Sequence, residues 1–236
     1  MNQEESNQKI LKQINEKWQF DRNIFLEHIY NVDMEIKNYN GLTPIMFILE
    51  NNKNKNINLS AEEIEKLINK SNLNTLSNEI MNISMYLMVY NEREGIHIKP
   101  EKIKKIIQKS NRNIKNYFGW TWLNILLFNN EKQKIDCSKK EIKDIYNELD
   151  EDNQQQTFKT LIKEYYDKIN DDDHEVIIKN IDFLLYDCKF EPNEELKKYL
   201  LQNDEEIIKK IEKRDLLFNL NNGLSKEQKI EKVLKV

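Results

Sequence analysis

The sequence predicts an all-α protein, a helical-repeat solenoid of stacked two-helix units. An apolar pattern at residues 40–49 returns at 82–88 and again at 118–127, at intervals of 39 residues. Thr43, for example, precedes Thr121 by 78 positions, which is twice that interval. A constant period of about 20 to 50 residues is typical of repeat proteins, in which one unit cannot bury its apolar face alone. Glycine and proline are scarce, with 4 and 3 copies in 236 residues, and this favours long helices over many tight turns.

The composition agrees with this fold class. A chain of this length could form one or two compact domains, or one continuous solenoid. With 33% charged and 39% hydrophobic residues, the chain is polar for a protein with a single globular core. A solenoid has such a composition because every repeat keeps a large solvated surface. Asparagine, lysine and isoleucine are abundant, which we attribute to the base composition of the genome, so many asparagines are expected to carry no structural message.

Charge, cysteines and hydropathy argue against several classes of protein. The formal net charge is −4, whereas a nucleic-acid-binding protein is usually basic. The two cysteines, Cys137 and Cys188, form no CxxC motif, so reduced thiols are expected. No run of about 18 apolar residues is present, and the first residues lack the basic and apolar regions of a secretory signal. We therefore expect no membrane span, and a protein that is cytoplasmic or exported without a cleaved secretory signal.

Residues 1–35 are predicted to form an N-terminal helical cap of two helices. The apolar residues at helical spacing begin at Ile10 in the first helix and at Phe25 in the second. This segment follows the 39-residue pattern loosely, as expected of a terminal repeat with a polar outer face. His28 falls on an apolar position of the pattern, and we expect it to be partly buried and not a ligand.

Four repeats follow, each with an inner helix, a polar loop and an outer helix. Ser60 and Glu63 form a capping box at the start of the first outer helix, and Ser138 and Glu141 form another in the third repeat. In the second repeat Pro100 opens the outer helix, where its missing N–H is not needed. The fourth repeat matches the pattern most weakly. The repeats are placed at about 36–74, 75–113, 114–152 and 153–189.

The outer helices share an apolar triad in all four repeats. The triads are Ile64, Leu67 and Ile68; Ile103, Ile106 and Ile107; Ile142, Ile145 and Tyr146; and Ile181, Leu184 and Leu185.

The register of the repeat ends after Cys188. Residues 190–236 are predicted to form a C-terminal helical cap with helices at about 194–202, 205–217 and 225–236. The last helix opens with a capping box of Ser225 and Gln228. Such a cap would cover the apolar face of the fourth repeat.

The opening of the first inner helix resembles the motif of a known family. Residues 41–46 read Gly-Leu-Thr-Pro-Ile-Met, which resembles the Gly-x-Thr-Pro-Leu-His opening of ankyrin repeats. Residues 119–123, Gly-Trp-Thr-Trp-Leu, are a degenerate copy of it, and residues 67–71 resemble the Leu-Leu-x-x-Gly end of the second ankyrin helix. The resemblance covers about 36–150 and implies a repeat that binds other proteins.

The chain also departs from the ankyrin pattern. Its period is 39 residues, against about 33 in ankyrin repeats, and the extra residues fall in the loop between the helices. Bulky residues such as Ile48 and Leu49 replace the small residues inside the first helix, which should separate the two helical layers or change their stacking angle. The motif histidine is replaced by Met46, Met85 or Asn124. A two-helix repeat of the TPR or HEAT kind is therefore an open alternative.

Few residues indicate chemistry. The acidic cluster from Asp171 to Glu175, which includes His174, could hold a divalent cation for a metal-dependent enzyme. It lacks the EF-hand spacing, and we interpret it as a solvated loop in which Asp173 caps the next helix. No HExxH motif, phosphate-binding glycine loop or Gly-x-Ser-x-Gly motif is present. We expect no catalytic residue, no metal and no cofactor.

Two further residues, His97 and Cys137, are of types that can carry chemistry. His97 has no second ligand close to it in the sequence. Cys137 lies on the repeated apolar position of Leu59 and Ile98, so we expect a buried thiol and not a nucleophile.

A basic stretch runs from Lys99 to Lys115. We interpret it as the solvated face of an outer helix, and the alternative is a surface for an acidic partner or an RNA backbone. Nucleic-acid binding is therefore a second possible function, although the net charge argues against it. The cations are Lys99, Lys102, Lys104, Lys105, Lys109, Arg112 and Lys115.

Aromatic and apolar residues recur where ankyrin-like stacking would place a concave groove. These residues lie two and five positions beyond Ile45 and its equivalents, and others lie on the hairpins beside them. Exposed aromatic side chains are the usual anchors of a protein interface. The alternative is that a widened repeat takes these residues into its core. The predicted partner-binding residues are Tyr39, Leu42, Phe47, Tyr86, Val89, Tyr117, Trp120, Ile125 and Phe128.

The sequence thus predicts a non-enzymatic protein-interaction module that binds another protein through a concave apolar and aromatic groove. The resemblance to ankyrin repeats implies an adaptor or a host-directed factor. The partner is expected to be peptide-like or helical, and the chain is expected to be a monomer.

Overall fold

The computed structural model describes residues 2–16, 19–167, 173–203 and 207–213. Within these ranges every regular element is a helix, which confirms the all-α class. An isolated bridge between Lys115 and Thr121 is the one β-type pairing of the described chain. No described helix has the length and apolar character needed to cross a membrane. The chain divides into two compact units, Met1–Thr160 and Leu161–Val236.

The first unit begins with two helices that pack against each other, α1 (Gln3–Asn15) and α2 (Arg22–His28). The Asp21 side chain caps α2 by accepting the N–H groups of Asn23 and Ile24. His28 is buried, and its Nδ1 lies 3.2 Å from the hydroxyl oxygen of Ser6. The histidine is therefore a satisfied buried residue, as predicted.

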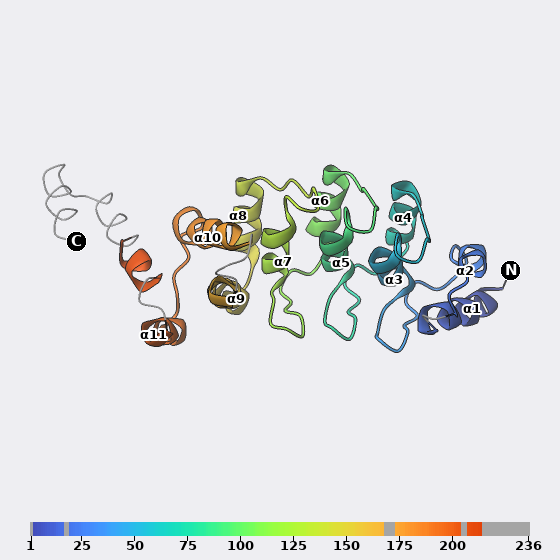
Figure 1. Ribbon diagram of the computed structural model, residues 1–236, viewed down its shortest axis with the longest axis horizontal. Coiled ribbons are helices and arrows are strands. Elements are labelled where there is room, and N and C mark those ends of the chain that lie inside the picture. Colours follow the sequence, from blue (N-terminus) through green and yellow to red (C-terminus); the bar gives the residue numbers. More distant parts are fainter. Residues whose placement is uncertain (1, 17–18, 168–172, 204–206, 214–236) are drawn as a thin grey trace, which may run out of the picture. The chain divides into compact units, whose positions relative to one another are not determined.

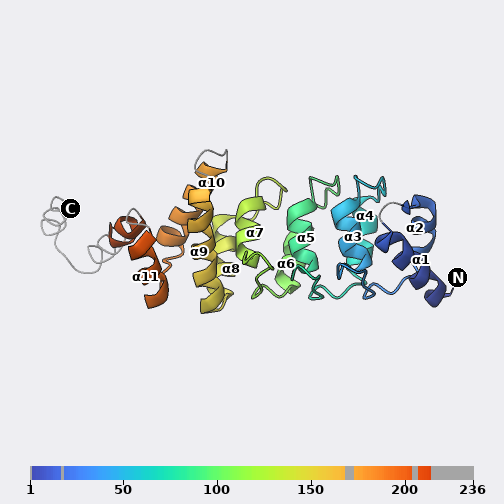
Figure 2. The same cartoon turned by 60° about the horizontal axis from the view of Figure 1, so that its bottom comes forward.

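Three inner helices form the centre of the first unit: α3 (Pro44–Asn51), α5 (Ile83–Tyr90) and α7 (Trp122–Asn129). Each starts after a capping residue, and Thr43, Asn82 and Thr121 stand 39 residues apart. In both views α3 and α5 lie side by side, as do α5 and α7 (Figures 1 and 2). Because neighbours cover them, these helices are apolar on most of their circumference.

Three outer helices lie along one side of the inner helices, opposite the side from which the hairpins extend (Figure 1). They are α4 (Ala61–Ile68), α6 (Pro100–Lys109) and α8 (Lys139–Glu148). Both predicted capping boxes are present, and Pro100 occupies the first turn of α6. The apolar triads of all three helices are buried, whereas their remaining residues are largely exposed or half-buried.

A hairpin precedes each inner helix, and the three hairpins extend from the same side of the first unit (Figure 1). In the first hairpin Asn38 Oδ1 accepts the N–H groups of Asn40 and Leu42. Asn116 Oδ1 does the same for Phe118 and Trp120 in the third hairpin. The turn needs one residue of positive φ, because the chain must reverse within a few residues.

Asparagine side chains hold the loop between inner and outer helices; two of the three are buried and Asn130 is half-buried. Asn52, Asn91 and Asn130 stand 39 residues apart, and each accepts and donates a backbone hydrogen bond seven residues further along the chain. Asn91 also donates to the carbonyl of Gln133 in the following repeat. The expectation that many asparagines carry no structural message is wrong at these positions.

The fourth repeat differs from its prediction. Helix α9 (Glu151–Asp167) has 17 residues and begins where the sequence register places a hairpin. Asp150 starts it by accepting the N–H of Asn153 through its side chain, and residues 151–160 contain no glycine or proline that would break a helix. Residues 155–159, which correspond in the register to the first hairpin at 38–42, are helical, and the division between the two units also falls inside this helix.

The second unit contains α10 (His174–Asp182), the π-helix η2 (Phe183–Asp187) and α11 (Glu194–Asn203). Ile181, Leu184 and Leu185 are buried, as the triad predicts. A further helical segment covers 207–213, inside the predicted second cap helix. The third cap helix, with Ser225 and Gln228, lies outside the described residues.

Candidate protein-interaction surface

The residues of the predicted groove lie mostly in the core. Phe47 is fully buried, with its ring 5.9 Å from that of Phe20 and 6.0 Å from that of Phe25. The prediction that these side chains line an open groove is therefore wrong for the buried residues. The alternative, that they belong to the core of the repeat, is correct. The physical reason is coverage, since the inner helices pack against one another and the rings of Phe20 and Phe25 lie against Phe47. The buried members are Leu42, Phe47, Tyr86, Ile125 and Phe128.

Val89 and Trp120 hold intermediate positions. Both are half-buried, and the Trp120 ring lies 4.8 Å from that of Phe128, centroid to centroid. Trp120 therefore covers Phe128 and forms the base of the third hairpin, not its tip.

The tips of the hairpins carry the exposed apolar residues. We call Tyr39, Ile80, Tyr117 and Phe118 the hairpin-tip surface. Tyr39 is 85% exposed, Tyr117 74% and Phe118 70%, which makes them the most exposed large apolar side chains of the described chain. The rings of Tyr117 and Phe118 meet edge to face at 5.7 Å. Most proteins bury such side chains or use them to bind a partner.

Hydrogen bonds between successive hairpins fix the backbone under these side chains. The Asn78 N–H donates to the carbonyl of Asn40 at 3.2 Å, and its side chain donates to the carbonyl of Tyr39 at 3.0 Å. The Tyr117 N–H donates to the carbonyl of Glu79 at 2.9 Å. The exposed rings are thus presented by hairpins that brace one another.

Side chains close both ends of this row of hairpins. At the first hairpin Asn15 Oδ1 accepts the N–H of Tyr39 at 2.9 Å. At the third, Gln156 and Thr160 of α9 donate to the carbonyl of Gly119 at 3.1 and 3.3 Å. Addition of a partner strand would have to displace these bonds, so side chains and not a free strand edge would bind a partner.

The middle hairpin differs from its neighbours at one position. Gly41 and Gly119 have φ values of 71° and 82°, and the equivalent residue of the middle hairpin is Ile80 with φ 59°. A left-handed conformation costs an L-residue with a β-carbon roughly 1–2 kcal/mol, and it is least suited to a β-branched residue. Strain of this kind is often found where a side chain has a function. Ile80 is also 40% exposed.

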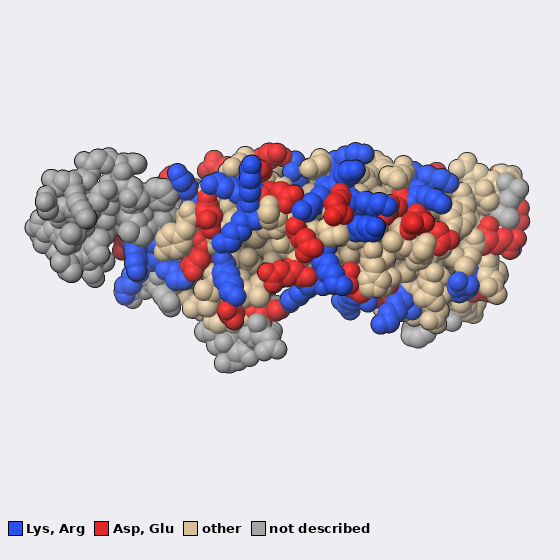
Figure 3. Space-filling model, turned by 90° about the horizontal axis from the view of Figure 1, so that it is seen from above, with Lys and Arg blue, Asp and Glu red and all other residues tan. Residues whose placement is uncertain are grey.

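The basic stretch is largely neutralised. Four of its seven cations pair with carboxylates of an adjacent repeat or of the start of α9, and Figure 3 shows acidic and basic side chains intermingled on the outer-helix face of the first unit. These cations hold neighbouring elements together and do not form a continuous track for a phosphate backbone. The pairs are Lys102 with Glu65, Lys104 with Glu141, Arg112 with Glu148 and Lys115 with Asp152.

The residues weighed for chemistry are used structurally. His174 stacks on Tyr165 at 4.7 Å, and Glu175 pairs with Lys179 at 2.9 Å. Asp173 stands at the start of α10, but its side chain makes no capping hydrogen bond, contrary to expectation. Asp171 and Asp172 lie outside the described residues. Among the residues that are described, no three His, Cys, Asp or Glu side chains gather closely enough to hold a metal ion.

The two remaining candidates also have structural explanations. Burial raises the pKa of the Cys137 thiol to about 11, so the thiol stays protonated near neutral pH and is a poor nucleophile. His97 is an exposed loop residue with φ 57°, and its Nδ1 lies 3.2 Å from Glu92 Oε2.

Sequence reasoning missed Ile80 and Phe118. Both could have been found from the 39-residue register, since Ile80 is equivalent to Gly41 and Phe118 is equivalent to Asn40. The signal for such an exposed residue is a large apolar side chain at a tip position where another repeat has glycine or asparagine.

Comparison of the chain with models of known protein families gave no match, and comparison with curated proteins gave none either.

Proposed function

We propose that this chain is a non-enzymatic protein-interaction module that binds a protein partner through the hairpin-tip surface. One observation carries the proposal: the three most exposed large apolar side chains among the described residues share the tips of the first and third hairpins. Burying such rings against a partner removes apolar surface from water, at about 25 cal/mol for each Å².

We also propose that residues 36–152 form an ankyrin-like helical-repeat solenoid. Three features support this: the 39-residue period, hairpins that precede each inner helix, and Thr43 and Pro44 at the start of α3 in the manner of the ankyrin motif. Inner helices of neighbouring repeats contact one another, as stacking requires. Repeat proteins of this kind usually bind other proteins.

The chemistry of the tips favours a protein partner with apolar side chains. Two tyrosines and one phenylalanine offer large rigid rings, and the tyrosine hydroxyls add hydrogen-bonding capacity at low entropic cost. The hairpins hold these rings before a partner arrives, so little ordering is needed on binding. We propose a peptide-like or helical segment as the partner, bound by a monomer of this chain.

The test is affinity capture with the full-length chain as bait. A Tyr117→Ser/Phe118→Ser double variant should lose its captured partner, since anchor residues of an interface often contribute about 2 kcal/mol or more each. Both side chains are exposed, so the melting temperature should stay close to that of the unmodified chain.

The matched control is Tyr186→Ser, which removes another exposed ring, outside the hairpins. It should leave capture unchanged. Equal capture by the double variant and the unmodified chain would refute the hairpin-tip surface as the binding site.

A further inference from the structure

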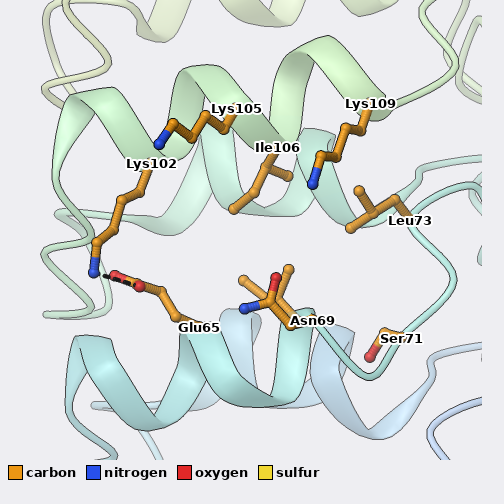
Figure 4. Close-up of a pocket in the computed structure, with 9 residues that line it drawn as sticks. Glu65, Asn69, Ser71, Leu73, Lys102, Lys105, Ile106 and Lys109 are labelled. Atoms are coloured by element: carbon orange, nitrogen blue, oxygen red, sulfur yellow. Dashed lines mark hydrogen bonds and ion pairs between the residues drawn. The ribbon is translucent and has the colours of Figure 1, made fainter.

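A groove lies between two outer helices, α4 and α6 (Figure 4). Both helices lie on the side of the first unit away from the hairpin tips (Figure 1). Its volume is about 340 Å³, in the range of small binding pockets. Helix α4 and the turn after it form one wall, and α6 forms the other. The lining residues are Glu65, Ile68, Asn69, Ser71, Leu73, Lys102, Lys105, Ile106 and Lys109.

The groove carries an excess of positive charge. Lys102 reaches across it to the carboxylate of Glu65, so this pair is neutral (Figure 4). Lys105 and Lys109 also line the groove, and within the described chain neither one has a carboxylate partner. Two uncompensated ammonium groups therefore border a space that contains only one carboxylate, which is already paired.

The unpaired lysines differ from their neighbour on the same helix. Lys104 points to the other side of α6, where it pairs with Glu141 of α8 at 3.1 Å. The sequence offers α4 no carboxylate one turn beyond Glu65, since Asn69 stands there. The side chain of Asn69 lies below Lys105 and Lys109 in the close-up and is exposed (Figure 4).

Apolar side chains lie between the charged groups. Ile68 and Ile106 belong to the buried triads of α4 and α6 but still contribute to the lining, and Leu73 is half-buried at one end of the groove. A ligand that fits must therefore present both negative charge and aliphatic surface. Negative charge alone would leave the apolar lining in water.

We propose that this groove binds a short acidic segment of a partner protein. Carboxylates of the segment lie against Lys105 and Lys109, and an aliphatic side chain between them packs on Ile106 and Leu73. Charge-assisted hydrogen bonds from lysine to carboxylate supply the specificity. The site is separate from the hairpin-tip surface and does not depend on the function proposed for it.

A continuous phosphate backbone suits the groove less well. The Glu65 carboxylate stands in its lining, and the cations that would extend the track, Lys104, Arg112 and Lys115, are committed to ion pairs. Nucleic-acid affinity depends on many phosphate contacts at once. Two lysines with an apolar floor favour a peptide.

The experiment is an NMR titration of the full-length chain with a capped hexapeptide of alternating glutamate and leucine. We expect saturable shifts of the backbone amides of Ser71, Leu73, Lys105 and Lys109. A Lys105→Gln/Lys109→Gln double variant should bind the peptide at least about tenfold more weakly. Both lysines are exposed, so the variant should remain folded, which its spectrum shows directly.

Three controls sharpen the result. Lys99→Gln removes a charge from the same basic stretch but outside the groove lining, and it should change the affinity less than about twofold. A peptide with glutamine in place of glutamate should not bind. The Tyr117→Ser/Phe118→Ser variant should bind the acidic peptide as the unmodified chain does, which separates this site from the hairpin tips.

The proposal is overturned if the glutamine peptide binds equally well, or if the lysine double variant keeps its affinity. It is also overturned if a uridine oligonucleotide shifts the same amides at lower concentration than the peptide. That result would assign the groove to nucleic acid.

Discussion

Two sets of aromatic residues in the first unit differ in their exposure to solvent. Phe47, Tyr86 and Phe128 of the inner helices are buried, whereas Tyr39, Tyr117 and Phe118 of the hairpin tips are exposed. Each set contains one pair related by the 39-residue register, Phe47 with Tyr86 and Tyr39 with Tyr117. The difference is coverage, because each inner helix has a neighbour on either side and the tips project beyond the helices (Figure 1). Periodic aromatic residues therefore identify a repeat, but only coverage by neighbouring elements decides which of them can bind a partner.

The largest expected effect on stability comes from truncating one buried ring, compared with truncating one exposed ring. Phe47→Ala should reduce the free energy of unfolding by about 3–5 kcal/mol, because it opens a cavity beside Phe20 and Phe25. Tyr39→Ala, eight positions earlier, should change it by less than about 0.5 kcal/mol. Chemical denaturation measures both. Similar losses for the two variants would mean that the assignment of core and surface is wrong.

A smaller effect compares the glycines of two tips. A β-carbon added at Gly41 would lie 2.6 Å from the backbone nitrogen of Asn78, whereas one at Gly119 would meet its nearest neighbour, Gln156 Nε2, at 3.6 Å. Gly41→Ala must therefore move the next hairpin and should cost at least about 2 kcal/mol. Gly119→Ala should cost only the left-handed strain, about 1 kcal/mol. Equal losses in thermal or chemical denaturation would contradict the bracing of the first two hairpins.

The smallest effect concerns the strained residue of the middle tip. Ile80→Gly should change the free energy of unfolding by less than about 0.5 kcal/mol, because relief of strain offsets the lost side-chain contacts. Val89→Gly, at a half-buried position in α5, should cost at least about 2 kcal/mol, since it has no strain to relieve. A loss at Ile80 as large as that at Val89 would show that Ile80 is held without strain.

Local signals made much of the fold predictable. Thr43 with Pro44, Ser60 with Glu63 and Ser138 with Glu141 start helices through contacts within a few residues, and the structure places helix starts at all three. The start of α9 departs from the repeat register, because the propensity of residues 151–160 favours a helix where the register places a hairpin. The hydrogen bonds of Asn52, Asn91 and Asn130 are not among the predictions, because the abundance of asparagine is attributed to the base composition of the genome. Their spacing of 39 residues was the available signal.

The candidate site was only partly predictable. Tyr39 and Tyr117 were expected at an interface and are exposed, and the role in binding remains a prediction. Burial of Phe47 depends on Phe20 and Phe25, which come from a segment outside the regular repeats, so no pattern within the repeats could reveal it. The unpaired state of Lys105 likewise depends on which residue of α4 faces it.

Hydroxyl-radical footprinting of the full-length chain, read residue by residue by mass spectrometry, tests the contrast between core and tips most directly. Tyr39, Tyr117 and Phe118 should be oxidised rapidly, while Phe47, Tyr86 and Phe128 should be protected until the chain is unfolded. Oxidation of Tyr86 and Phe128 at rates close to that of Tyr117 would contradict the account and restore an open groove along the inner helices.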